Sequence, residues 1–283
     1  MSFMQSFKNL FVQKKRVIGT TDLRRALTHN EFVFHYQPEW DLKTGKIKGL
    51  EALMRWESPN GIIPPNDFIP VLEETGLINS FTPFLFSQTL SDLHELHALG
   101  FSDLFMSVNV SAVQLRDPTL IETIQKNLAQ YAILPEHLEC EITENKYVGK
   151  EKIEFETLKT LKQMGVRVSI DDFGSGHASL NYIKNINIHK IKIDIEFIRD
   201  LFEKESNQTI MRTIIELGHS LDLSVLAEGV EEPRQEKWLA ENGCDYAQGF
   251  LCSKPLPLST LISFLRTHVS QTNQSPVNEE SNS

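Results

Sequence analysis

Short clusters of carboxylate and amide side chains lie beside seven apolar runs of this sequence, where buried strands are expected. The clusters contain Glu51, Asn109, Glu141 with Glu144, Asp171 with Asp172, Lys192 with Asp194, Glu228 with Glu231, and Gln248. Carboxylates that are crowded together repel one another unless protons or metal ions compensate their charge. A divalent-metal site at one end of a barrel is the simplest common cause.

Eight segments have the composition of strands, because they are rich in Val, Ile, Phe or Tyr and bounded by Gly, Pro or Asn. The expected strands are Phe32–Pro38, Ile47–Trp56, Phe105–Val110, Leu138–Ile142, Arg167–Phe173, Lys190–Asp194, Ser224–Gly229 and Tyr246–Leu251. Helical patterns separate most of them, at Asp67–Glu74, Pro83–Ala98, Thr119–Tyr131, Lys150–Met164, Glu203–Leu221 and Pro233–Glu241. Within Glu203–Leu221, one expected apolar face carries Ile210, Ile214, Leu217 and Leu221.

Alternating strands and helices predict a parallel α/β architecture. Eight strands over about 220 residues fit a single-domain, TIM-like (β/α)₈ barrel. Residues 39–46 are too few for a crossover helix, so the first two strands should form an antiparallel pair. Active sites of such barrels lie at the C-terminal ends of the strands, where the polar clusters fall. Glu51 is the exception, because it lies mid-run; either its strand leaves the barrel early or it bends there.

The formal net charge of −10 argues against bulk nucleic acid as a partner, since such binding depends on basic surface. It does not exclude a small anionic nucleotide, because metal ions can invert the local field. Three cysteines without a CxxC pair favour a reduced, cytoplasmic compartment. No apolar stretch approaches the length of a membrane span.

The chain divides into three expected parts. Residues 1–20 form a basic and apolar lead-in segment, which could pack on the domain, on a sensor partner or on a membrane surface. Residues 21–266 form the barrel, and the polar residues 267–283 form a disordered tail. His94 and His97 lie three apart on an expected helix, but without further soft ligands nearby a solvated helix face explains them better than zinc.

An ordered set of motifs over residues 21–262 resembles the EAL domain family, bacterial phosphodiesterases that hydrolyse cyclic di-GMP. The set comprises EAL (51–53), PPNDFIPVLEETGLI (64–78), SVNVS (107–111), EITE (141–144), DDFGSG (171–176), KID (192–194), AEGVE (227–231) and QGF (248–250). Departures from the family pattern include Ser175 for Thr, His177 for an aromatic residue, and Glu39-Trp40 where an apolar residue is usual. None of them removes an expected metal ligand.

The resemblance implies two divalent cations, Mg²⁺ or Mn²⁺, which prefer oxygen ligands. One cation would take Glu51, Asn109, Glu141 and Asp171; Asp171 would bridge to a second cation held by Asp172 and Glu228. Adjacent residues on a regular strand point to opposite faces, so Asp171 and Asp172 can both serve only if the chain bends there. The alternative is that Asp172 caps the next helix.

Lys192 would act as the general base or orient the attacking water. Nearby cations would lower its pKa and nearby carboxylates would raise it, and an ion pair with Asp194 or Glu228 is the alternative role. The resemblance places Arg55, Gln248 and Gln37 against the substrate. Glu144, Asp194 and Glu231 would orient the ligands or the water around the cations.

The resemblance implies hydrolysis of one phosphodiester of cyclic di-GMP to linear 5′-pGpG, with Lys192, Glu51 and Asp171 as catalytic residues. Two other functions stay open: a catalytically silent cyclic di-GMP receptor and a regulatory module that binds other proteins. The resemblance also implies a homodimer.

Overall fold

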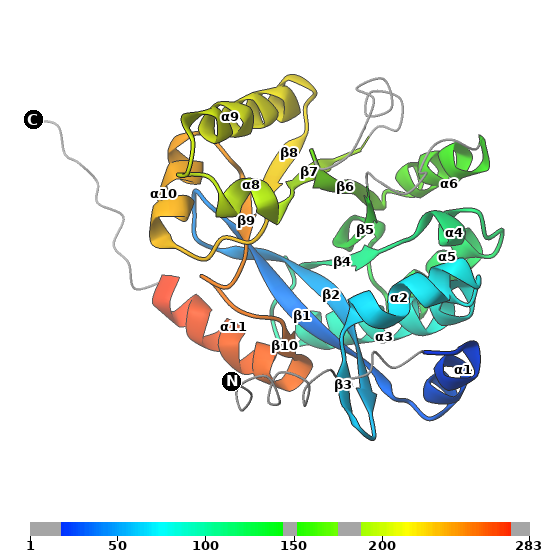
Figure 1. Ribbon diagram of the computed structural model, residues 1–283. Helices are drawn as coiled ribbons and strands as arrows, with labels where there is room; N and C mark the ends of the chain where they lie inside the picture. The colour runs from blue at the N-terminus through cyan, green and yellow to red at the C-terminus, as the bar shows by residue number, and fades with distance from the viewer. Residues whose placement is uncertain (1–17, 144–151, 175–187, 273–283) are drawn as a thin grey trace, which may run out of the picture.

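The computed structural model describes residues 18–143, 152–174 and 188–272. Its strands form one sheet in the order β10-β1-β9-β8-β7-β6-β5-β4-β2-β3, and an additional β1–β2 pairing closes it into a barrel. Helices surround the barrel (Figure 1), which confirms the predicted single-domain TIM-like fold. The strands are β1 Phe32–Asp41, β2 Ile47–Ser58, β3 Gly61–Ile63, β4 Phe105–Asn109, β5 Leu138–Thr143, β6 Arg167–Phe173, β7 Lys190–Ile193, β8 Ser224–Ala227, β9 Tyr246–Gln248 and β10 Leu256–Pro257.

The helices that cover the barrel begin and end close to the expected positions where the apolar pattern is strong. They are α1 Thr20–Thr28, α2 Pro65–Glu74, α3 Ile78–Ala98, α4 Ala112–Leu115, α5 Leu120–Gln130, α6 Lys152–Gln163, α8 Ile195–Arg199, α9 Glu205–Ser220, α10 Pro233–Glu241 and α11 Leu258–Thr272. The predicted start of α3 at Pro83 is wrong: the helix begins at Ile78, because Ile78 and Phe81 are buried in the core. None of the helices in the described ranges is long and apolar enough to cross a membrane.

Strand β1 runs antiparallel to both of its barrel neighbours, β2 and β9. The predicted antiparallel pair is therefore confirmed. On its other side, β2 pairs in parallel with β4 only from Gly49 to Ala52, and past Ala52 it continues beside β1 and β3. Glu51 thus lies where β2 leaves the barrel, so the first of the two explanations for its mid-run position is correct.

Four strands end earlier than expected, at Asn109, Ile193, Ala227 and Gln248. Asp194 and Glu228 therefore follow the ends of β7 and β8 rather than lying within them. The boundary expected at residue 266 lies inside α11, which continues to Thr272. The lead-in residues 1–17 and the tail residues 273–283 lie outside the described residues.

The face of α9 that packs on the barrel differs from the expected one. Met211, Ile214 and Ile215 are buried, whereas Ile210 is 43% exposed. Gly218 sets this orientation, because a Cβ atom there would lie 2.4 Å from Cγ2 of Val225 on β8. The expected stripe is therefore correct for Ile214, Leu217 and Leu221, which pack on the core, and wrong for Ile210, because the helix is rotated slightly about its axis.

We expect Gly49→Ala to lower the free energy of unfolding by about 1–3 kcal/mol, as overpacking usually does. A Cβ atom at residue 49 would lie 2.4 Å from Cζ of Phe105 on the paired strand β4. Urea denaturation measures this loss. The same substitution in a Phe105→Leu background should cost clearly less, and equal costs in the two backgrounds would contradict the clash.

Candidate active site

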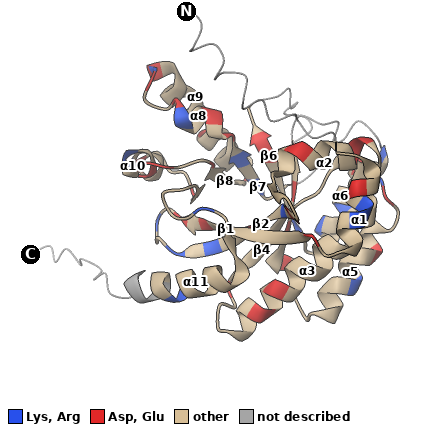
Figure 2. Ribbon diagram, turned by 60° about the horizontal axis from the view of Figure 1, so that its bottom comes forward, with Lys and Arg blue, Asp and Glu red and all other residues tan. Residues whose placement is uncertain are grey.

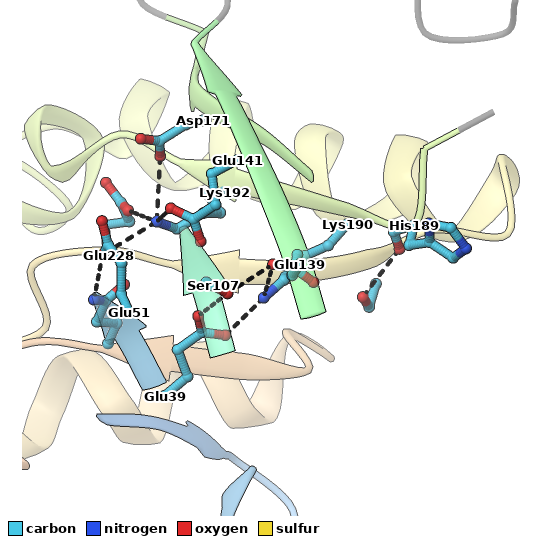
Figure 3. Close-up of polar contacts among 12 residues, drawn as sticks. Glu39, Glu51, Ser107, Glu139, Glu141, Asp171, His189, Lys190, Lys192 and Glu228 are labelled. Carbon is cyan, nitrogen blue, oxygen red and sulfur yellow. Dashed lines mark hydrogen bonds and ion pairs between the residues drawn. The ribbon is translucent and has the colours of Figure 1, made fainter. Parts of the chain in front are cut away.

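The predicted acidic residues converge inside the barrel at the C-terminal ends of the parallel strands. Figure 3 shows Glu51, Glu141, Asp171 and Glu228 around the amine of Lys192. Figure 2 shows the same contrast of charge on the ribbon, with acidic residues at the end of β6 and basic residues on β7. Alternation along each strand explains the arrangement, because every second side chain points into the barrel.

Lys192 is fully buried and lies at the centre of this acidic layer. Its Nζ atom lies 2.7 Å from Glu141 Oε2, 2.7 Å from Glu228 Oε1, 3.4 Å from Glu51 Oε2 and 3.5 Å from Asp171 Oδ1. Of the two alternative partners, Glu228 makes the ion pair. Asp194 instead accepts a hydrogen bond from the backbone N–H of Glu196 at 2.7 Å and caps α8.

In the described part of the chain, the carboxylates around Lys192 outnumber its ammonium, and the pKa values of Glu51, Glu141 and Glu228 are shifted. Burial raises the pKa of Glu141 and of Glu228 well above the usual value, although Lys192 opposes the shift. Burial acts on Glu51 in the same direction, but the charge of Lys192 and the hydrogen bonds from Gln248 and Asn109 bring its pKa below the usual value. For Lys192, burial disfavours the charge, yet the surrounding carboxylates raise its pKa well above that of an ordinary lysine.

The oxygens of this layer fit a cation site. Among the described residues, buried oxygens of Glu141, Asp171 and Gln248 have no hydrogen-bond partner. Asp171, Asp172 and Glu228 each offer an oxygen within 4.8 Å of the others. Hard oxygen donors of this kind suit Mg²⁺ and Mn²⁺, and unpartnered buried oxygens are costly unless something ligates them.

The backbone bends at Asp172, as the predicted use of both aspartates requires. Asp172 has a φ of 56°, and the pairing of β6 with β7 shifts register between Ile170 and Phe173. Burial and the neighbouring charge of Asp171 raise the pKa of Asp172 to about 6. The bend brings both carboxylates to the same side of the strand, where Glu228 joins them.

A cavity of about 410 Å³ opens beside the acidic layer. Glu51, Asn109, Glu141, Asp171 and Asp172 line one part of it. Apolar residues from β1, β2, α2 and α3 line the rest, namely Phe34, Met54, Ile69, Ile78, Phe81 and Leu85. The sequence patterns located the polar half, whereas the apolar half depends on how α2 and α3 pack over the mouth of the barrel.

Of the expected substrate-binding residues, Gln248 and Gln37 contact the acidic layer, whereas Arg55 binds a backbone carbonyl. Gln248 Nε2 donates to Glu51 Oε2 at 2.7 Å and lies 3.4 Å from Gln37 Oε1, so both glutamines join the acidic layer. Arg55 lies on β2 past its pairing with β4, and its Nη1 donates to the carbonyl of Met54 at 2.9 Å.

Glu231 is exposed, and its backbone N–H donates to Gln235. Glu144, Ser175 and His177 lie outside the described residues.

Asn109 donates a hydrogen bond from Nδ2 to Glu51 Oε1 at 2.8 Å. Gln114, which the sequence analysis did not predict, stabilises the loop that follows Asn109. Gln114 is buried, its Oε1 accepts from the backbone N–H and hydroxyl of Ser111, and its Nε2 donates to Thr82 at 3.0 Å. The spacing of Ser111 and Gln114 is that of a helix capping box, a signal that could have identified both residues.

We expect Gln114→Leu to lower the free energy of unfolding by about 1–3 kcal/mol, because buried donors and acceptors would lose their partner. Urea denaturation checks this, with Gln125→Leu at an exposed position of α5 as the control, for which about 0.5 kcal/mol or less is expected. Equal losses in the two variants would show that the hydrogen bonds of Gln114 do not stabilise the loop.

We expect Lys192→Met to destabilise the chelator-treated protein by about 3 kcal/mol or more, because four carboxylates lose their buried counter-charge. Added Mn²⁺ should then raise the melting temperature of the variant more than that of the unmodified protein. Thermal denaturation with EDTA and with Mn²⁺ measures both effects. A variant as stable as the parent in EDTA would contradict the role of Lys192 as counter-ion.

Comparison with known proteins agrees with the fold and with the acidic site described above. The family model described as EAL domain matches residues 20–255. The "Signaling protein YkoW" of Bacillus subtilis (strain 168) is 40% identical over 250 residues, which are 88% of this chain and 31% of that protein. The "Cyclic di-GMP phosphodiesterase NbdA" of Pseudomonas aeruginosa is 36% identical over 248 residues, 87% of this chain and 32% of that protein.

The chain thus spans about a third of the length of these curated relatives. Among solved structures, the "PaMucR Phosphodiesterase, c-di-GMP complex" superposes with a TM-score of 0.81 at 36% identity, covering 85% of this chain and 98% of that one. With the barrel, the reversed first strand and the acidic layer at its mouth, these matches show that the chain belongs to the EAL domain family.

Proposed function

We propose that this domain hydrolyses one phosphodiester bond of cyclic di-GMP and releases linear 5′-pGpG. The observation that carries the proposal is the convergence of Glu51, Asn109, Glu141, Asp171 and Glu228, at or just past the ends of separate strands, on one layer beside a cavity. Relatives with printed names that include cyclic di-GMP phosphodiesterase support the substrate. A catalytically silent receptor would have no need to keep so many buried carboxylates together, given what they cost.

The donor set suits two divalent cations, Mg²⁺ or Mn²⁺. Glu51, Asn109, Glu141 and Asp171 would hold one, and Asp171 with Asp172 and Glu228 would hold the other. When bound, such cations neutralise the charge of a phosphodiester and lower the pKa of a water molecule. Gln248 would hold Glu51 in place, since its Nε2 already donates to that carboxylate.

Lys192 has two states in this proposal. Without cations it is a charged counter-ion that its carboxylate partners hold in position. If those carboxylates served as ligands, Lys192 would lose part of their stabilisation, and its pKa would fall toward the range useful for a general base. The same side chain would then orient the attacking water or accept its proton.

The cavity provides the place for the nucleotide. Its apolar lining from β1, β2, α2 and α3 suits a flat base, and its acidic side would hold the cations that neutralise a phosphate. Gln37 would contact the substrate from β1, and Arg55 would reach a phosphate by rotating away from the carbonyl of Met54. Homodimerisation and a partner for the lead-in segment stay predictions.

We expect Glu51→Gln and Asp171→Asn each to reduce turnover by more than about 100-fold, since even changes to groups around metal ligands cost about 10–100-fold. Chromatography of cyclic di-GMP incubated with protein and Mn²⁺ measures the pGpG formed. Glu154→Gln is the control, because Glu154 is equally buried but pairs with Arg116 at 3.2 Å outside the barrel.

The same experiment separates the rival functions. Binding of cyclic di-GMP by the unmodified protein without any pGpG would favour the receptor. Neither binding nor turnover would favour a module that binds other proteins. Turnover that persists in Glu51→Gln would contradict the assignment of the acidic layer.

A further inference from the structure

A second charged layer lies inside the barrel directly beneath the acidic layer. It consists of Glu39 on β1, Ser107 on β4, Glu139 on β5 and Lys190 on β7, all of which are at most 2% exposed (Figure 3). Ser107, Glu139 and Lys190 each precede a residue of the acidic layer by two positions, namely Asn109, Glu141 and Lys192. Because side chains two apart on a strand share a face, the two layers stack along the barrel axis.

The contacts within this lower layer are short and mutual. Lys190 Nζ lies 2.6 Å from Glu39 Oε2 and 2.6 Å from Glu139 Oε1. The hydroxyl of Ser107 lies 3.2 Å from Glu39 Oε1 and 3.2 Å from Glu139 Oε1. The ring of Phe105 covers the Lys190 amine at 4.8 Å. When both carboxylates are ionised, they and the one ammonium give the layer a net charge of −1.

This charge lies next to a proposed cation ligand. Glu39, Glu139 and Glu141 each offer a carboxylate oxygen within 4.8 Å of the others. Glu141 Oε2 binds Lys192 at 2.7 Å, whereas its Oε1 has no hydrogen-bond partner among the described residues. Repulsion from below therefore favours a Glu141 carboxylate that points up toward the mouth of the barrel. Salt in the solvent screens such buried charges only weakly.

We propose that Glu39 is a positioning residue for the cation site: its buried charge, held by Lys190, directs the Glu141 carboxylate upward and strengthens binding of divalent cations. This inference rests on the cation site of the proposed function. Lys190 has the complementary role, because its ammonium compensates half of the charge of the two carboxylates and keeps Glu39 and Glu139 in the barrel. A purely structural lower layer would affect stability and leave the cation affinity of the folded protein unchanged.

Calorimetric titration of Mn²⁺ into chelator-treated protein tests the proposal. We expect Glu39→Gln, which keeps the shape of the side chain but removes its charge, to weaken Mn²⁺ binding by about tenfold or more. Glu154→Gln removes an equally buried charge outside the barrel and should change the dissociation constant by less than about twofold. Ser107→Ala removes hydrogen bonds of the lower layer without removing charge, and its affinity should stay equally close to that of the parent.

Each outcome decides one question. If the unmodified protein does not bind Mn²⁺, the proposed cation site itself fails. If it binds and Glu39→Gln binds within twofold of it, or if Glu154→Gln weakens binding as much, the role of Glu39 is overturned while the cation site stands. Should Glu39→Gln not fold, Glu139→Gln removes the same charge from β5, and an unchanged affinity there overturns the inference as well.

Discussion

The interior of this barrel depends on the compensation of buried carboxylates by very few cations. Among the described residues, Lys192 is the one ammonium within 3.5 Å of oxygens from Glu51, Glu141, Asp171 and Glu228, and solvent does not reach it. One ammonium cannot neutralise four carboxylates, so the layer retains unpartnered oxygens and raised carboxylate pKa values. A fold that keeps this imbalance is poised to bind divalent cations, because ligation relieves the repulsion that folding creates.

Because of the strand pleat, the charged side chains form two layers that stack along the barrel axis. Lys190 and Lys192 point the same way from β7, as do Glu139 and Glu141 from β5. The lower layer has one lysine between two glutamates, whereas the upper layer has one lysine among four carboxylates and is more acidic. The gradient of charge along the barrel axis thus ends at the cavity, which is where a phosphate compensated by cations would lie.

Much of this arrangement could be predicted from the sequence, and the failures have physical causes. The strand order and the strand-end residues Asn109, Glu141 and Asp171 follow from local pattern, because each strand end has a local signature. The orientation of α9 did not follow, since it depends on the contact of Gly218 with Val225, residues that meet only in the fold. Glu39 and Lys190 pair although they lie 151 positions apart in the sequence. No local pattern indicates which buried charges will meet.

The reversed direction of β1 determines how the chain enters the domain. In a barrel built only of parallel strands, the polypeptide arrives at the face opposite the catalytic mouth. Here the first strand descends from the mouth, so α1 lies on the side where chemistry would occur. Helix α1 packs against α2, and α2 contributes Pro65, Asn66 and Ile69 to the cavity wall. A displacement of α1 would therefore reach the cavity wall through a single helix-to-helix contact.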